Sequence, residues 1–132
     1  MRYILAIPSL VFVFAVLNYC IFMGIDLTAK LTQFDMISGQ VLEVNFGDIL
    51  ILVGLLCLFV DILKSVRTSV GSVIEHAFST ILLIAAIVEF LMLKQAGTMV
   101  FLVITFMMLI DVVGGYSVTI GTARRDFSMV DR

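Results

Sequence analysis

Four apolar runs, separated by shorter polar segments, dominate the pattern of hydrophobic and polar positions along the chain. They cover approximately residues 4–23, 49–66, 77–93 and 98–120. An α-helix rises about 1.5 Å per residue, so a run of about 20 residues crosses a hydrocarbon layer of about 30 Å. The pattern therefore predicts an all-α bundle of four transmembrane helices, with residues 1–132 forming a single membrane domain.

The first run follows Arg2, in the place where a secretory signal peptide would also lie. At about 20 residues it is longer than the usual apolar region of a signal peptide, about 7–15 residues, and no small-residue cleavage site follows it. Pro8 falls in the expected first turns, where a missing backbone N–H is least harmful. We therefore expect this run to be retained as the first span.

The polar connection over residues 24–48 lies between the first two runs. Asp26 is a suitable helix N-cap, and Leu27, Leu31 and Phe34 recur at helical spacing until Ser38 and Gly39 interrupt the pattern. This spacing predicts a short amphipathic helix on the membrane surface. Residues 41–46 alternate loosely between apolar and polar, which favours an extended lead-in to the second span.

Basic residues near the ends of the runs predict the orientation, because cytoplasmic loops of membrane proteins carry an excess of Lys and Arg. One side of the expected bundle holds Arg2, Lys64, Arg67, Arg124, Arg125 and Arg132, and the other holds Lys30 and Lys94. We therefore expect both termini and the tail 122–132 to be cytoplasmic, and loop 24–48 to face outward. A bacterial inner (plasma) membrane is the expected location.

Composition agrees with a lipid environment and excludes several classes of protein. The chain is 62% hydrophobic and 14% charged, whereas soluble domains average about 45–50% and about 25%. A net charge of −2 without a basic run excludes a nucleic-acid partner. Cys20 and Cys57 lie within apolar runs and are read as packing residues. With one histidine and no catalytic motif, we expect no enzyme activity, metal or cofactor.

The second and fourth runs share three landmarks at a separation of fifty positions. Gly47, Asp61 and Gly71 align with Gly97, Asp111 and Gly121. Either a repeated helix design or coincidence in so apolar a chain explains the match. In both cases, Asp61 and Asp111 are expected at nearly the same depth.

Ionisable residues within the spans need an explanation, because each costs about 2.5–3.5 kcal/mol on insertion scales. One interpretation is a paired-carboxylate site of Asp61 and Asp111 that holds a proton or cation, with His76 as a titrating partner. The alternative for Asp61 is an ion pair with Lys64 one turn away, which we favour. For Asp111 the alternative is hydrogen bonding to hydroxyl or backbone groups near Gly114, but we favour the functional interpretation.

Glu89 lies near the outer end of the third span and is a further candidate for an ion or proton site. Asn18 in the first span is expected at a similar depth, so an Asn18–Glu89 hydrogen bond is predicted as a polar pair. Small residues that allow helices to approach closely complete the pattern. They are Gly47, Gly54, Ala85, Ala86, Gly114 and Gly115. The pair Gly114-Gly115 either permits close contact or opens the fourth helix locally.

Two functions are compatible with these features. The first is a structural or accessory subunit, or a self-assembling module, that binds other chains through small-residue helix faces. The second is a small oligomeric ion channel or proton-coupled transporter that uses the intramembrane carboxylates. Four short helices enclose little volume, so either function predicts a homo-oligomer or a larger membrane-protein partner in the lipid bilayer.

Overall fold

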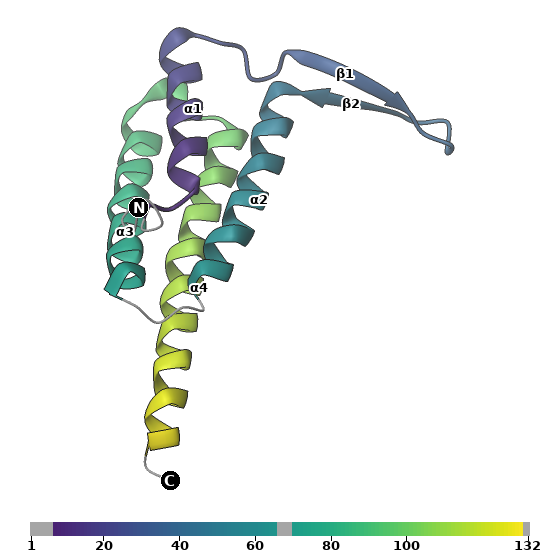
Figure 1. The fold of residues 1–132 in the computed structure, drawn as a ribbon. Helices are drawn as coiled ribbons and strands as arrows, with labels where there is room; N and C mark the ends of the chain where they lie inside the picture. Colours follow the sequence, from purple (N-terminus) through teal and green to yellow (C-terminus); the bar gives the residue numbers. More distant parts are fainter. Residues whose placement is uncertain (1–6, 66–69, 131–132) are drawn as a thin grey trace.

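The computed structural model describes residues 7–65 and 70–130, and it is mostly helical (Figure 1). The helices are α1 (Leu10–Met23), α2 (Phe46–Ser65), α3 (Val70–Met92) and α4 (Met99–Val130), with a short 3-10 turn η2 (Lys94–Ala96). Two strands, β1 (Lys30–Asp35) and β2 (Val41–Asn45), lie between α1 and α2.

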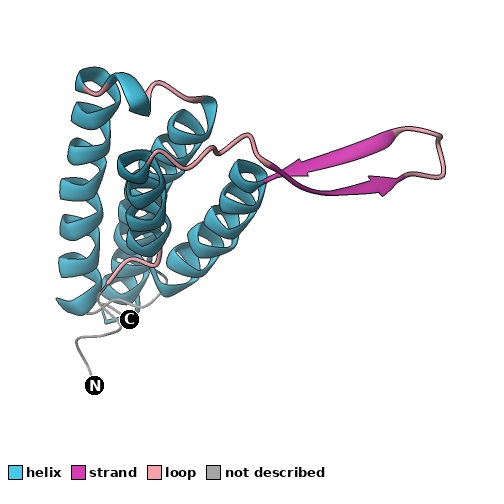
Figure 2. Ribbon diagram, turned by 90° about the horizontal axis from the view of Figure 1, so that it is seen from above, coloured by secondary structure: helices cyan, strands magenta, loops and turns pink. Residues whose placement is uncertain are grey.

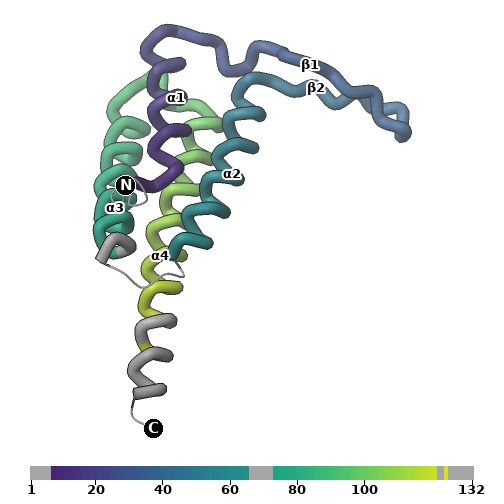
Figure 3. The backbone as a smooth tube through the Cα atoms, in the orientation of Figure 1, coloured from purple at the N-terminus to yellow at the C-terminus, as the bar shows by residue number. Residues whose placement is uncertain are grey.

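The four helices pack side by side, and α4 contacts each of the other three (Figures 1 and 2). The backbone tube shows α1 in front of α4, with α3 on one side of it and α2 on the other (Figure 3). Leu17, Phe101 and Ile104 are completely buried between the helices. The rest of the bundle surface is covered by exposed apolar side chains, as expected where lipid is the solvent.

Three helical segments are long and apolar enough to cross a membrane: Phe46–Ser65, Val73–Met92 and Met99–Gly121. The expectation of four full spans is therefore only partly met. Helix α1 has 14 residues, about 21 Å at 1.5 Å per residue, which is short for a full crossing. It begins at Leu10, so Pro8 precedes the helix instead of lying in its first turns. Residues 4–6 of the predicted first span lie outside the described residues.

The other spans differ from prediction mainly at their ends. Helix α2 begins at Phe46, three residues early, and residue 66 lies outside the described residues. Helix α3 begins at Val70 and not at 77, so Glu75 and His76 belong to the helix. Helix α4 continues through the predicted tail to Val130. This extension is physically reasonable because Ala, Arg and Met are good helix formers and no proline follows Gly121.

The predicted amphipathic surface helix is wrong, although the bundle itself is helical as predicted. Residues 30–45 form an antiparallel β-hairpin that pairs Gln33 with Glu43 and Phe34 with Leu42. The tip turns at Gly39, whose φ of 82° suits glycine. The helical spacing of Leu27, Leu31 and Phe34 is too short to nucleate a helix, since marginal helices need about 12–15 residues. The extended lead-in is confirmed as β2.

Strand β2 runs into α2 without a linker, so the hairpin is fixed to the start of that helix. The Phe46 N–H donates to the Ala29 carbonyl at 3.1 Å, and the Gly47 N–H donates to the Leu27 carbonyl at 2.8 Å. The Asp48 carboxylate accepts the Asn45 N–H at 2.9 Å. These bonds hold both ends of the hairpin against the bundle, from which it projects sideways (Figure 2).

Candidate functional site

Buried polar side chains gather near the end of the bundle where α2 ends and α3 begins. We call this group the polar cluster. It consists of Asp61, Lys64, Ser65, Glu75, His76, Ser79, Asp111 and Thr119. Its members come from α2, α3 and α4, and the start of α1 contacts it, so it joins all four helices.

Asp61 is 2% exposed and makes the most contacts in the cluster. Its Oδ1 accepts the Lys64 ammonium at 2.9 Å, which confirms the predicted ion pair one turn away. Oδ1 also accepts the Ser9 N–H at 2.9 Å and the Ser9 hydroxyl at 2.8 Å. Oδ2 accepts the Leu10 N–H at 3.1 Å. Asp61 therefore caps the N-terminus of α1 from a neighbouring helix, where unpaired N–H groups favour an anion.

Lys64 extends the cluster to α3. Its ammonium lies 3.5 Å from Glu75, which is 6% exposed, and it donates to the Ile7 carbonyl at 3.4 Å. A single lysine thus connects the start of α1, the end of α2 and the first turns of α3. Glu75 was not among the predicted site residues, because the sequence placed it before the third span.

Asp111 receives the Ser79 hydroxyl at 2.7 Å and is 2% exposed. The alternative prediction of a hydroxyl partner is therefore met, but the hydroxyl comes from α3 and not from the Gly114 region of α4. Asp61 and Asp111 interact electrostatically. They bond to different groups, however, so the structure places two separately bound carboxyls in one cluster instead of a directly paired dyad.

His76 lies between α3 and α4. Its Nε2 is 3.1 Å from the Thr119 hydroxyl, and its ring centroid is 5.2 Å from that of Tyr116. Gly115 makes this position possible, because a Cβ there would touch His76 Cε1 and lie 2.7 Å from Nδ1. The Thr119 hydroxyl also reaches the Ser65 carbonyl at 3.4 Å. His76 thus lies in the cluster, next to the glycine pair.

Glu89 and Asn18 lie outside the cluster. The Asn18 amide donates to the Phe14 carbonyl at 3.2 Å, one turn back in its own helix. The buried Asn18 Oδ1 and Glu89 Oε2 have no hydrogen-bond partner among the described residues. The structure therefore does not form the predicted Asn18–Glu89 hydrogen bond.

The predicted packing residues fall into two groups. Gly47, Gly54, Ala86 and Gly115 are buried inside the bundle. A Cβ at Gly47 would lie 2.6 Å from Val100, and one at Gly54 would lie 2.9 Å from Met107, so both glycines let α2 approach α4. Ala85 is exposed, and a Cβ at Gly114 would meet nothing within 4 Å. Helix α4 is continuous through both glycines and does not open.

The chemistry of the cluster is that of an internal network. Three carboxyls, one ammonium and one imidazole share hydrogen bonds with hydroxyl groups and with the N-terminus of α1. Within residues 7–65 and 70–130, no three His, Cys, Asp or Glu side chains form a group suited to a metal ion. The two cysteines, Cys20 and Cys57, are not bonded to each other.

No protein-family model, curated protein or solved structure matches the chain. The part of the chain that the structure describes is mostly helical and holds three segments long and apolar enough to cross a membrane, and the function must be argued from its own residues.

Proposed function

We propose that this protein is a self-assembling structural module of the membrane, in which copies associate through α4. The observation that carries this proposal is the contrast between two adjacent glycines. His76 occupies the space beside Gly115, whereas the space beside Gly114 is open. A glycine within a spanning helix costs about 0.5–1 kcal/mol of stability relative to alanine. A glycine with open space beside it therefore favours close contact with another chain.

Gly114 belongs to a stripe of small residues on the outer face of α4. Ser117 and Gly121 follow at three and seven positions, a spacing that places all three on one helix face. Both are exposed, and a Cβ at Gly121 would also meet nothing within 4 Å. Stripes of this kind let transmembrane helices approach closely, because packing and not hydrophobicity drives association in lipid.

The polar cluster supports the same proposal. Its carboxyls are bound to Lys64, to Ser79 and to the start of α1, so the cluster has a structural use within one copy. A buried network of this kind fixes how helices are arranged and needs no external ligand. We assign it the role of holding a rigid bundle that presents α4 to its partner copy, with no catalytic role.

Disulfide cross-linking tests the contact face directly. In a background with Cys20 and Cys57 changed to Ala, Ser117→Cys should form dimers on oxidation in native membranes. Leu109→Cys is the matched control, since Leu109 is an exposed residue of α4 outside the stripe. Equal cross-linking at both positions, or none at Ser117, would refute an interface at this stripe.

One observation favours proton-coupled transport as a second candidate. The cluster holds three carboxyls against one lysine, and the Glu89 carboxyl oxygen Oε2 is buried without a hydrogen-bond partner among the described residues. Acidic side chains that outnumber the basic ones inside transmembrane helices are typical of proton relays. If transport is the function, Asp111→Asn should abolish an ion or proton flux measured in reconstituted vesicles, while Gln33→Asn on the hairpin should leave it unchanged.

The orientation belongs to the proposal as well. We assign both termini to the cytoplasmic side of the plasma or inner membrane, because in the sequence most Lys and Arg residues near the ends of the apolar runs fall on that side of the expected topology. With Cys20 and Cys57 replaced by Ala, Asp35→Cys on the hairpin should react with an impermeant thiol reagent added outside intact cells. Labelling only after the cells are opened would reverse the orientation.

A further inference from the structure

The β-hairpin is amphipathic across its two faces. In an antiparallel pair, directly opposed residues share a face and alternate along each strand. The pairings Thr32 with Val44 and Phe34 with Leu42 define what we call the apolar face. The opposite face carries Gln33, Asp35 and Glu43 together with the exposed apolar Val41, and Lys30 joins it by donating to Gln33 at 2.7 Å and to Glu43 at 2.6 Å. Leu31, also exposed, lies at the register shift between Lys30 and Thr32.

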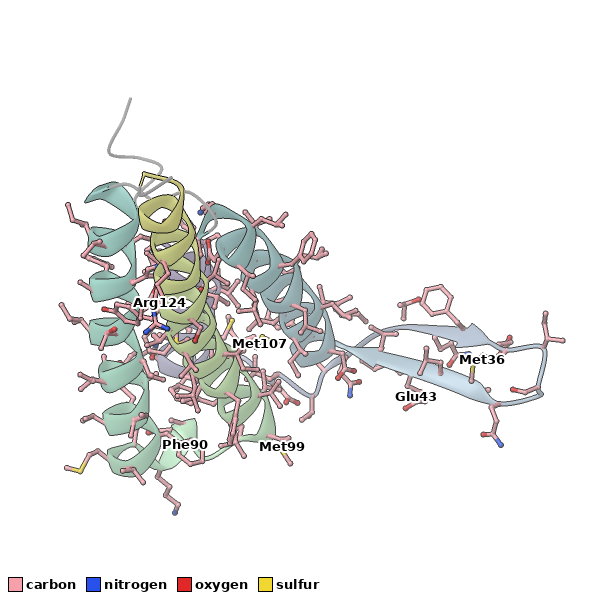
Figure 4. All side chains as sticks on the ribbon, turned by 90° about the horizontal axis from the view of Figure 1, so that it is seen from below. Met36, Glu43, Phe90, Met99, Met107 and Arg124 are labelled. Carbon is pink, nitrogen blue, oxygen red and sulfur yellow. The ribbon has the colours of Figure 1, made fainter. Side chains whose placement is uncertain are left out.

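The apolar face is uncovered in the bundle. Phe34 is 58% exposed and Leu42 is 49% exposed. The tip adds Met36 and the fully exposed Ile37. Figure 4 shows the hairpin side chains, with Met36 and Glu43 labelled, standing clear of the helices. An isolated two-stranded hairpin is marginally stable in water, so we expect its apolar face to be covered by another apolar layer that stabilises it.

The position of the hairpin identifies that layer. Its base joins the first residue of α2, so it starts where a membrane-spanning segment begins. From there it runs sideways and slopes toward the other end of the bundle, so that its tip lies level with the first turns of α2 (Figures 1 and 3). Those turns expose Ile49 and Leu52, which face lipid in a spanning helix.

Aromatic side chains mark the same level on α1. Tyr19 is 60% exposed and Phe22 is 71% exposed, both in the last turns of α1, at the end of the bundle from which the hairpin leaves (Figure 1). Exposed aromatic residues near the ends of spanning helices are typical of the boundary between lipid and water. The hairpin therefore leaves the bundle within the interfacial layer and stays there.

We propose that this hairpin is an interfacial anchor, whose apolar face and Met36–Ile37 tip insert into the lipid leaflet beside the bundle. Lipid fits better than a protein partner because the surface is small: four side chains and a two-residue tip fall well below the roughly 800 Å² per partner of a stable interface. A strand of six residues at about 3.3 Å each reaches about 20 Å across the leaflet surface. The anchor fixes the tilt of α2 and does not depend on self-assembly.

Charge indicates which lipid chemistry is needed. The connection over residues 24–48 carries Asp26, Asp35, Glu43 and Asp48 against the single Lys30. This acidic balance gives no attraction to anionic headgroups, so burial of apolar side chains provides the binding. Insertion should occur in zwitterionic phosphatidylcholine and should not weaken as salt rises.

The chain contains no tryptophan, so a single introduced one reports its own surroundings. We would reconstitute the full chain carrying Ile37→Trp, Phe34→Trp or the control Gln33→Trp into phosphatidylcholine vesicles, with and without brominated phosphatidylcholine. All three positions are exposed, so the substitutions leave the bundle intact. The tip and apolar-face variants should show blue-shifted emission and several-fold stronger quenching by the brominated lipid than Gln33→Trp.

Two results would overturn the proposal. Emission from Ile37→Trp and Phe34→Trp that matches Gln33→Trp, with equal quenching by aqueous iodide, would show a hairpin standing in water. Blue-shifted emission without quenching by brominated lipid would show that protein covers the apolar face. Dependence of that shift on the protein-to-lipid ratio would identify the covering protein as a second copy.

Discussion

At the scale of single residues, Asp61 stands out because one carboxylate serves two purposes. It neutralises Lys64 and caps α1 at Ser9 and Leu10, more than fifty residues earlier in the chain. Neither purpose requires a transported ion. Stability is therefore the property that an Asp61 substitution should change first.

Asp61→Asn keeps the shape of the side chain but removes its charge. Since hydrogen bonds to charged groups contribute about 1.5–3 kcal/mol, we expect the free energy of unfolding to fall by about that amount. Denaturation in mixed micelles, followed by helical circular dichroism, measures it. Adding Lys64→Met to this variant should cost less than the sum of the two single changes, because no unpaired ammonium remains. Strict additivity would contradict the pairing.

Gly114 and Gly115 provide a matched pair of substitutions on one helix turn. Gly115→Ala places a Cβ against the His76 ring, and such overpacking costs about 1–3 kcal/mol. Gly114→Ala meets no atom of its own copy within 4 Å, so in a detergent that keeps the protein monomeric it should stabilise α4 by about 0.5–1 kcal/mol. Thermal unfolding in detergent should therefore move in opposite directions for the two variants. A shift of the same sign would contradict the close contact between Gly115 and the His76 ring.

At the scale of elements, α2 and α4 meet over two glycines that differ in their neighbours. Gly47→Ala would press on the short Val100 side chain at 2.6 Å, and we expect a loss of about 1–3 kcal/mol. Gly54→Ala presses on the flexible Met107 side chain, which can move, so its cost should stay below about 1 kcal/mol. Unfolding of both variants under one set of conditions tests this order, and a larger loss at Gly54 would contradict it.

The hairpin can be weakened without touching the bundle. Gly39 has a φ of 82°, a conformation that costs other residues about 1–2 kcal/mol. Gly39→Ala should therefore speed hydrogen exchange of amides in β1 and β2 while exchange in α3 stays unchanged. Ser38→Ala, one residue earlier and with negative φ, is the control. Equal acceleration in the hairpin and in α3 would show that the two do not open separately.

Hydropathy was sufficient to predict the helices, because burial in lipid requires long apolar runs and little else. Hydropathy could not predict that α1 begins at Leu10, because residues 7–9 belong to the same predicted apolar run as the helix. The hairpin was missed because Leu27, Leu31 and Phe34 match a helical period while residues 30–35 also suit a strand. Only the pairing with Val41–Asn45, which is non-local, decides between them.

The candidate site was predicted in part. The sequence pointed to Asp61, Asp111 and His76 because charge within an apolar run is conspicuous. It also predicted the Asp61–Lys64 pair, which lies within one helical turn. The contacts of Ser9 with Asp61 and of Ser79 with Asp111 span 52 and 32 residues, so no local spacing reveals them. Serine is common enough that composition gives no signal either.

At the scale of the whole molecule, one end of the bundle is held by the polar cluster and the other carries the projecting hairpin. At the level of the cluster and just beyond it, α4 presents Gly114, Ser117 and Gly121 to its surroundings. A rigid bundle with one open small-residue face is suited to association with further copies. Self-assembly is therefore the central claim of this account.

The mass of the purified protein in lipid nanodiscs, with all associated chains identified by mass spectrometry, tests that claim most directly. We expect a discrete homo-oligomer that shifts toward monomer in Gly114→Leu, where a large side chain fills the stripe, but not in Leu109→Phe, at an exposed position of α4 outside the stripe. A wild-type monomer, or a stoichiometric complex with a different chain, would contradict self-assembly through α4.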